Sequence, residues 1–324
     1  MINRRGKVCR IEAPCKINLH LSVARKRPDG FHDIESLFAS LALSDTLEFT
    51  ISGGEGVCIL TTNTHEPSVA EGDRVISTED NLVYKAVSLF RRRTGYKDGL
   101  AVNLTKRIPM GAGLGGGSSD AASTLLALNA LSGHPCPDGE LAEMAAVLGS
   151  DVPFFLTGGL AFISGRGERI KPVKTEEIPL LAPLSVVLVK PPFSSDTAAA
   201  YRLLDEAREN ARGVEGKPLA AVFPCPQSLI SHLQKDLKTW PFFNDFLPVF
   251  LAGKGEKPLA YKAILDGLQN AGASFVSLSG SGSCCFGVFP SQEMAKKALK
   301  GLAVGGNFVE LTFFLANRAN TVVE

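Results

Sequence analysis

The chain has 324 residues, of which 45% are apolar and 21% are charged. This composition is typical of globular proteins, and the length suits two domains of ordinary size. The formal net charge is only +1, so no overall field favours nucleic acid or an anionic membrane, and any anionic ligand must be held by local groups.

The first part of the chain is predicted to be rich in strands. Apolar residues alternate with polar or small ones over residues 17–23, as on a half-buried strand. A turn is expected at residues 27–30, where proline, aspartate and glycine follow one another. Two further strands are expected over residues 41–51 and 58–61.

The middle of the chain alternates between helices and strands around a glycine-rich segment. A helix is predicted over residues 82–93, ending before Gly95, and a strand over residues 100–104. Beyond the glycines, apolar helices are expected over residues 120–131 and 139–148, each followed by a glycine that ends it.

The character of the sequence changes after a predicted hairpin over residues 161–170. A strand is expected over residues 186–189, a helix over residues 197–210 and a loop over residues 213–226. The last part resembles a split βαβ unit. Its helices and strands are predicted, in chain order, over residues 259–270, 275–278, 285–289, 292–302 and 308–314.

The cysteines and the apolar stretches limit the environment and the partners of the protein. The seven cysteines are scattered and form no C-x-x-C pair, which indicates a reduced, cytoplasmic protein without a disulfide framework or a zinc site. The longest strongly apolar stretch, residues 180–189, is too short to span a bilayer. We therefore expect neither a nucleic-acid partner nor a membrane partner; the oligomeric state stays open, with a homodimer among the alternatives.

The glycine-rich segment carries the clearest functional pattern. Five glycines within seven residues leave backbone N–H groups open to a ligand, and the helix that follows starts with unpaired N–H donors and a positive dipole end. This arrangement predicts a site for the phosphates of ATP. Its residues are Pro109, Met110, Gly111, Ala112, Gly113, Leu114, Gly115, Gly116, Gly117, Ser118 and Ser119. Ser118 or Ser119 is expected to cap the helix, or to offer a hydroxyl to a phosphate or to Mg²⁺.

Two common phosphate-binding motifs and a plain turn fit this loop less well. A Walker A loop needs lysine where this chain has Gly117. A dinucleotide fingerprint fits Gly111, Gly113 and Gly116, but it requires a strand with an acidic residue after the helix, and here a second helix follows. A simple turn without a ligand needs one or two glycines rather than five.

Several polar residues are candidates for the chemistry, and each also has a purely structural role open to it. Asp151 precedes Pro153, so on the residues alone we favour a cap for a short helix over residues 152–157. Lys16 is the only cation in its apolar strand and is ordinarily an exposed strand lysine. Asn18 lies on the same strand face as Lys16, where it could share a site or sit at a polar edge.

Two ring side chains are candidates for holding a base. Phe31 and His32 follow the turn at residues 27–30, and these rings can stack on a base and hydrogen-bond to it. An ordinary turn with Phe31 in the core accounts for this segment equally well. On the residues alone, Tyr201 is a core aromatic on the predicted helix over residues 197–210.

Residues 109–122 closely resemble the second motif of the GHMP kinases, the superfamily of galactokinase, homoserine, mevalonate and phosphomevalonate kinases. Residues 13–19 with 27–32, residues 149–155, and residues 279–283 resemble further motifs of these kinases, in family order. The triple-glycine form resembles the branch that phosphorylates a cytidine-diphosphate-linked methylerythritol in the non-mevalonate isoprenoid pathway.

The resemblance implies an α+β fold of two domains with the active site between them. The N-terminal domain, which we place at residues 1–175, is expected to be ribosomal-protein-S5-like. The C-terminal domain, residues 176–324, is expected to be ferredoxin-like, in agreement with the split βαβ pattern.

The resemblance also implies roles for single residues. Asp151 becomes the base that accepts the proton of the substrate hydroxyl, and Lys16 its neighbour. Asn18, Phe31, His32 and Tyr201 become substrate-binding residues, with Tyr201 stacking opposite Phe31. The family usually has tyrosine at the Phe31 position, so any contact through that hydroxyl is absent here. ATP and Mg²⁺ are the expected cofactors, with Ser119 as the protein contact to the metal.

Two rival functions remain at this stage. One is a GHMP kinase for another alcohol, such as homoserine or mevalonate, which Phe31, His32 and Tyr201 oppose because those alcohols have no base to stack. The other is a non-catalytic nucleotide sensor on the same fold, which the presence of both Lys16 and Asp151 opposes.

Overall fold

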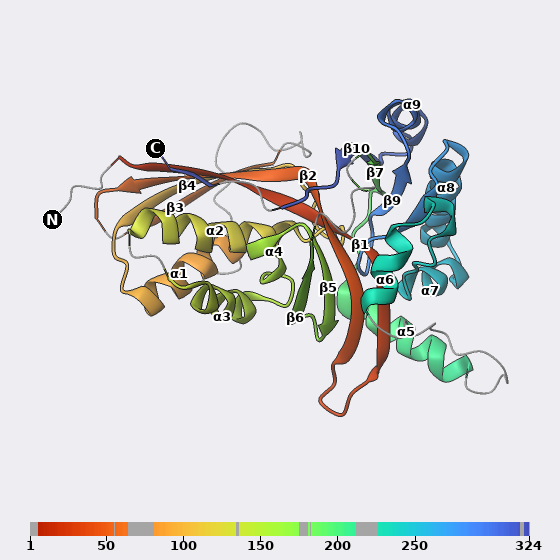
Figure 1. Ribbon diagram of the computed structural model, residues 1–324, viewed down its shortest axis with the longest axis horizontal. Coiled ribbons are helices and arrows are strands. Elements are labelled where there is room, and N and C mark those ends of the chain that lie inside the picture. The colour runs from red at the N-terminus through yellow and green to blue at the C-terminus, as the bar shows by residue number, and fades with distance from the viewer. Residues whose placement is uncertain are drawn as a thin grey trace.

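Figure 1 shows the computed structural model of the chain. It describes residues 6–54, 56–63, 81–133, 136–174, 181, 183–211, 226–317 and 321–323. Two sheets organise these residues, one of seven strands and one of four.

The first sheet has the strand order β11-β1-β2-β4-β3, with β5 paired to β2 and β6 paired to β5. Its strands are β1 (Val8–Lys26), β2 (His32–Ser52), β3 (Val57–Asn63), β4 (Gly99–Lys106), β5 (Leu160–Gly165), β6 (Arg169–Val173) and β11 (Thr321–Val323). Only β3 and β4 pair in parallel. The predicted strands and the hairpin over residues 161–170 are confirmed.

Helices cover one face of the first sheet, as Figure 1 shows. They are α1 (Leu82–Thr94), α2 (Gly116–Ser132), α3 (Asp138–Leu148) and α4 (Phe154–Thr157). Helix α1 begins where the Asn81 side chain accepts the N–H of Val83, and it ends at Gly95 in a left-handed conformation, as predicted. The apolar faces of these helices and the sheet enclose one core.

The second sheet has the order β10-β7-β9-β8 with all neighbours antiparallel. Its strands are β7 (Ser185–Lys190), β8 (Phe275–Leu278), β9 (Cys285–Phe289) and β10 (Phe308–Phe313). Its helices are α5 (Thr197–Ala211), α6 (Pro226–Leu233), α7 (Phe246–Ala252), α8 (Glu256–Asn270) and α9 (Gln292–Leu302). With α8 and α9 as the crossovers, this is the expected ferredoxin-like order.

Strand β1 departs from its prediction because it is buried on both faces. Lys16, Asn18 and His20, on the expected solvent side, are as buried as the apolar residues between them. The apolar side, with Ile17 and Leu19, shares a core with β7 and β9 of the second half. On the other side, Lys16 and Asn18 contact Asp151 and Ser36, and His20 packs on Phe243.

The chain changes from one sheet to the other between Val173 and Ser185. The division that we expect at 175/176 falls there, in a stretch outside the described residues, and we retain it as a proposal. Strand β11 was not predicted; it returns to pair with β1, from Cys9 opposite Val323 to Ile11 opposite Thr321. Residues 213–225 of the predicted loop lie outside the described residues.

Candidate active site

A cleft of about 1360 Å³ opens between the two halves of the molecule. Strands β1 and β2, the start of α2, the segment before α4 and helix α5 contribute to its walls. The predicted catalytic and substrate-binding residues all line it: Lys16, Asn18, Phe31, His32, Asp151 and Tyr201.

The glycine loop lines a second, smaller cavity of about 260 Å³, and its residues Gly113, Gly115 and Ser118 also line the larger cleft. Helix α2 begins inside the loop, four residues earlier than predicted, with Gly115 as its N-cap at φ 72°. The first helical hydrogen bond runs from the N–H of Ser119 to the carbonyl of Gly115. The N–H groups of residues 116–118 therefore have no helical partner and are available to an anion.

Neighbouring segments bind the carbonyl groups of the loop. The N–H of Lys16 donates to Leu114 (2.9 Å), and the N–H of Cys284 donates to Ala112 (3.1 Å). The Ser279 hydroxyl donates to the carbonyl of Gly113 at 2.9 Å. A Cβ atom on Gly113 would lie 2.2 Å from the Ser279 carbonyl oxygen, so only glycine lets the loop at residues 279–283 approach this closely.

Neither serine of the loop caps helix α2, contrary to one expectation for them. Both lie within its first turn, and the N-cap Gly115 has no side chain to offer. Ser118 lines both cavities. Ser119 is fully buried, and its hydroxyl has no hydrogen-bond partner among the described residues.

Lys16 and Asp151 meet in the cleft, with 3.6 Å between Nζ and Oδ2. The Lys16 side chain is only 4% exposed, whereas that of Asp151 is 30% exposed. Burial lowers the pKa of Lys16, and the Asp151 carboxylate opposes that shift. Nζ also donates to Asn18 Oδ1 at 2.7 Å, and Asn18 Nδ2 donates to Ser36 Oγ at 2.9 Å, so the ammonium has a fixed position.

Asp151 does not cap the short helix that follows it, which was the structural alternative for this residue. Helix α4 begins at Phe154, its N-cap is Pro153, and no side chain caps it. The carboxylate therefore stays available to the cleft and to Lys16.

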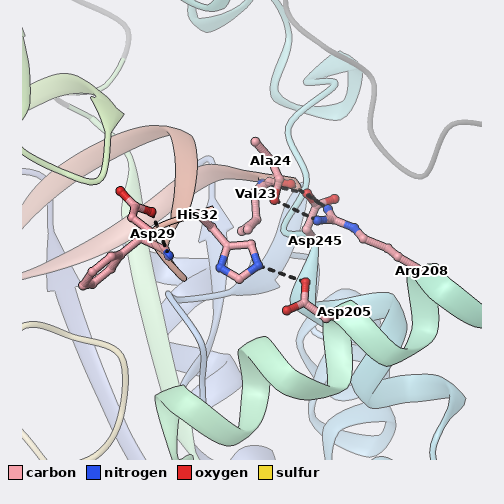
Figure 2. A network of polar contacts seen from close by, with 8 residues as sticks. Val23, Ala24, Asp29, His32, Asp205, Arg208 and Asp245 are labelled. Atoms are coloured by element: carbon pink, nitrogen blue, oxygen red, sulfur yellow. Dashed lines mark hydrogen bonds and ion pairs between the residues drawn. The ribbon is translucent and has the colours of Figure 1, made fainter. Parts of the chain in front are cut away.

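The predicted base-binding side chains lie along one wall of the cleft. His32 packs on Tyr201, with 4.8 Å between ring centroids, and its Nε2 is 2.9 Å from Asp205 Oδ1 (Figure 2). Burial raises the pKa of Tyr201 to about 12, so its hydroxyl stays protonated. Phe31 is half exposed, and the guanidinium of Arg166 lies 3.7 Å from its ring centroid. Tyr201 is therefore in contact with His32, and the group over Phe31 is Arg166.

Sequence reasoning missed a buried charge cluster beneath the glycine loop. Lys106 binds both Asp45 and Asp120, at 2.6 Å from Asp120 Oδ2. Asp45 Oδ1 also accepts the N–H groups of Arg107 and Ile108, where the chain enters the loop. Burial raises the pKa of Asp120 to about 7, against the attraction of Lys106. Three charges dispersed over 76 residues show no local motif, so only the fold brings them together.

Two family models match the chain. The model described as GHMP kinases N terminal domain matches residues 81–159, and the model described as GHMP kinases C terminal matches residues 243–304. The matches include the glycine loop, Asp151 and the loop at residues 279–283.

Curated relatives are similar over most of the chain. The 4-diphosphocytidyl-2-C-methyl-D-erythritol kinase of Thermodesulfovibrio yellowstonii is 39% identical over 89% of this chain and 92% of its own length. The chloroplastic enzyme of that name from Oryza sativa subsp. japonica is 43% identical, over 59% of this chain and 45% of its own length.

Solved structures show the same fold. A 4-(cytidine 5'-diphospho)-2C-methyl-D-erythritol kinase superposes with a TM-score of 0.71 and 30% identity, over 94% of this chain and 99% of that one. A mevalonate kinase superposes with a TM-score of 0.67 over 94% of this chain and 98% of that one, but at 16% identity it shows the fold alone.

Proposed function

Because the chain belongs to the 4-diphosphocytidyl-2-C-methyl-D-erythritol kinases within the GHMP kinases, we propose that its cleft transfers the γ-phosphoryl group of ATP to the 2-hydroxyl of that cytidine diphosphate compound. The chain is an ATP-dependent small-molecule kinase of isoprenoid precursor synthesis, and the products are the 2-phosphate and ADP. The observation that carries the assignment of roles is the meeting of Lys16 and Asp151 in a cleft bounded by the glycine loop and by the His32–Tyr201 wall.

Phosphoryl transfer needs positioning and charge neutralisation more than covalent catalysis. We assign the N–H groups of residues 116–118 to the phosphates of ATP, because they are unpaired and stand at the positive end of α2. The bound carbonyl groups of Ala112, Gly113 and Leu114 keep the loop in the shape that exposes those donors.

Asp151 is the proposed base, accepting the proton of the attacking hydroxyl. Its carboxylate is partly exposed to the cleft and lies 3.6 Å from the Lys16 ammonium. The same ammonium faces the region where negative charge develops during transfer, which stabilises the transition state.

The residues around the glycine loop fit Mg²⁺ held mainly by the nucleotide. This ion prefers oxygen ligands and commonly takes one or two protein groups beside phosphates and water. The unpaired Ser119 hydroxyl is such an oxygen, and Ser118, one residue earlier, reaches the cleft. We propose these hydroxyls as the protein contacts; bound there, the ion would neutralise charge on the phosphates.

The wall that contains Phe31, His32 and Tyr201 is the proposed cytidine site. Phe31 keeps a half-exposed ring face available for stacking, although Arg166 lies against it, and His32 offers a ring nitrogen for hydrogen bonding. Asn18 connects Lys16 to Ser36, so its role is to position the ammonium next to the substrate.

No helix in the described part of the chain is long and apolar enough to cross a membrane. We propose the cytoplasm as the compartment. The six described cysteines are all free, which supports a reducing environment.

A direct test offers ATP with each candidate alcohol and measures ADP release. We expect turnover with the cytidine diphosphate compound and none with mevalonate or homoserine. Turnover of mevalonate or homoserine alone would contradict the assigned substrate, and binding of ATP without turnover of any alcohol would favour a nucleotide sensor.

A further inference from the structure

His32 has its two ring nitrogens in different surroundings. Nε2 lies 2.9 Å from Asp205 Oδ1 on helix α5, and no described residue hydrogen-bonds to Nδ1. The side chain is only 6% exposed, yet the residue lines the cleft. In Figure 2 the second nitrogen is directed away from Asp205.

Asp205 determines which nitrogen of a neutral His32 carries the hydrogen. An ionised carboxylate accepts hydrogen bonds and donates none, so Nε2 must be the donor. Nδ1 of the neutral ring is then an acceptor and is the nitrogen left for a ligand. Tyr201 packs on the imidazole with 4.8 Å between ring centroids, and a flip of the ring would give up the contact of Nε2 with Asp205.

Helix α5 is attached firmly enough to hold this geometry. One turn beyond Asp205, the Arg208 guanidinium donates to the carbonyls of Val23 (2.6 Å) and Ala24 (3.1 Å), and it lies 3.0 Å from Asp245 Oδ2. Asp245 in turn accepts the N–H of Val23 at 2.8 Å. Figure 2 shows these contacts joining α5 to the end of β1, which pairs with the strand β2 that carries His32. The bonds of Arg208 to β1 hold α5 in place, and the His32–Asp205 contact holds the carboxylate beside the imidazole.

We propose that Asp205 is a positioning residue that fixes the hydrogen of His32 on Nε2, and thereby makes the cleft prefer a base that presents an amino group over one that presents a carbonyl. The inference rests on the proposed function, in which a cytidine group lies on this wall. Cytosine presents an amino donor to Nδ1, whereas uracil presents a carbonyl oxygen at the same place, and an acceptor facing an acceptor gains no hydrogen bond.

Asp205→Asn tests the proposal with little change of shape. The asparagine amide can turn so that its NH₂ group donates to Nε2, which moves the hydrogen to Nδ1 and suits uracil. Glu206→Gln, an exposed neighbour on α5, is the matched control. We expect the ratio of kcat/KM for the cytidine substrate to that for its uridine analogue to fall about tenfold or more in Asp205→Asn, and to stay at the wild-type value in the control.

Binding and spectroscopy separate this inference from the proposed function. The affinities of wild type and variant for CDP and UDP provide a second measure of the selectivity, one that needs no turnover. This measure is available even if the assigned reaction is wrong. The ¹⁵N chemical shifts of the His32 ring in the wild type report the tautomer directly, and we expect the hydrogen on Nε2.

The proposal is overturned if wild-type His32 carries its hydrogen on Nδ1 alone. It is equally overturned if Asp205→Asn leaves the selectivity ratio unchanged. A loss of affinity for CDP and UDP by the same factor is such a result, and it is what a merely structural contact would give.

Discussion

At the residue scale, Lys16 is a buried charge whose proposed role in the reaction opposes stability. Its ammonium lies in a site where burial lowers its pKa, between Asn18 Oδ1, the Asp151 carboxylate and the ring of Phe38. A methionine of similar length fills the same space without a charge to desolvate. We therefore propose that the charge serves the reaction more than the fold.

We predict that Lys16→Met lowers kcat about 10³-fold, because the developing charge loses its cation. The melting temperature should stay the same or rise, since no buried ammonium has to be desolvated. Steady-state kinetics together with calorimetry check both effects. A variant that loses activity and stability together would show that Lys16 is mainly structural.

Asp151 has a separate prediction. Asp151→Asn keeps the shape of the side chain but removes the proton acceptor, so we expect kcat to fall about 10²–10⁴-fold. Affinity for ATP should be unchanged, because the N–H donors of the glycine loop do not involve this side chain. Rapid-quench kinetics and nucleotide titration measure the two quantities, with Asp266→Asn on the exposed side of α8 as control. An unchanged rate would remove Asp151 from the role of base.

The residues of the site could be predicted to different degrees. The glycine loop was evident from the residues alone, because backbone conformation and a helix start account for it. Lys16 and Asp151 drew their weight from the resemblance, since a strand lysine and a helix cap were the better interpretations otherwise. Arg166 and Asp205 were missed: their partners lie 135 and 173 residues away along the chain, and only the fold brings them together.

At the scale of elements, the Lys106 cluster joins three parts of the first half. Asp45 comes from β2, Lys106 ends β4, and Asp120 lies in the second turn of α2. The glycine loop starts and ends next to this cluster. Two carboxylates share one cation, and burial raises the pKa of Asp120 to about 7.

This pKa predicts how the stability of the protein depends on pH. An acid whose pKa is raised on folding binds more protons in the native state, so its contribution to the free energy of unfolding falls as pH rises from about 4 to about 7. Asp120→Asn cannot titrate. The variant should therefore gain stability relative to wild type as pH rises through that range, and denaturant titrations at pH 5 and pH 8 measure the difference. The same difference at both pH values would show that Asp120 keeps its ordinary pKa.

Removing the cation of this cluster, Lys106, should instead destabilise the protein. Lys106→Met leaves two buried carboxylates without their partner, which should lower the free energy of unfolding by about 3–5 kcal/mol. Urea unfolding at pH 8 measures the loss. A loss below about 1 kcal/mol would mean that the cluster is solvated in the native protein.

At the scale of the whole molecule, local patterns predicted most elements but not how the two halves meet. The ferredoxin-like order followed from alternating helices and strands, each with its own periodicity. Strand β11 is only three residues long and pairs with β1, more than 300 residues earlier, so no local pattern could reveal it. The burial of both faces of β1 has the same kind of cause, because strands β7 and β9 and Phe243, which pack against it, lie far away along the chain.

The contact between the glycine loop and the loop at residues 279–283 is the point where both halves meet at the proposed phosphate site. Gly113 has φ +74°, and a Cβ atom there would lie 2.2 Å from Ser279 O and 3.0 Å from Gly282 O. Gly113→Ala should therefore push the two loops apart, raise KM for ATP at least tenfold and cost about 3 kcal/mol of stability.

Gly139→Ala is the matched control for this substitution. Gly139 lies within α3 with no atom within 4 Å of an added Cβ, so alanine should leave KM unchanged and add up to about 1 kcal/mol of stability. Kinetics and thermal unfolding of both variants measure the comparison. If Gly113→Ala bound ATP and melted like the wild type, the close approach of the two loops would have no part in forming the site. If it lost stability but kept its KM, the contact would serve the joining of the halves and not the nucleotide.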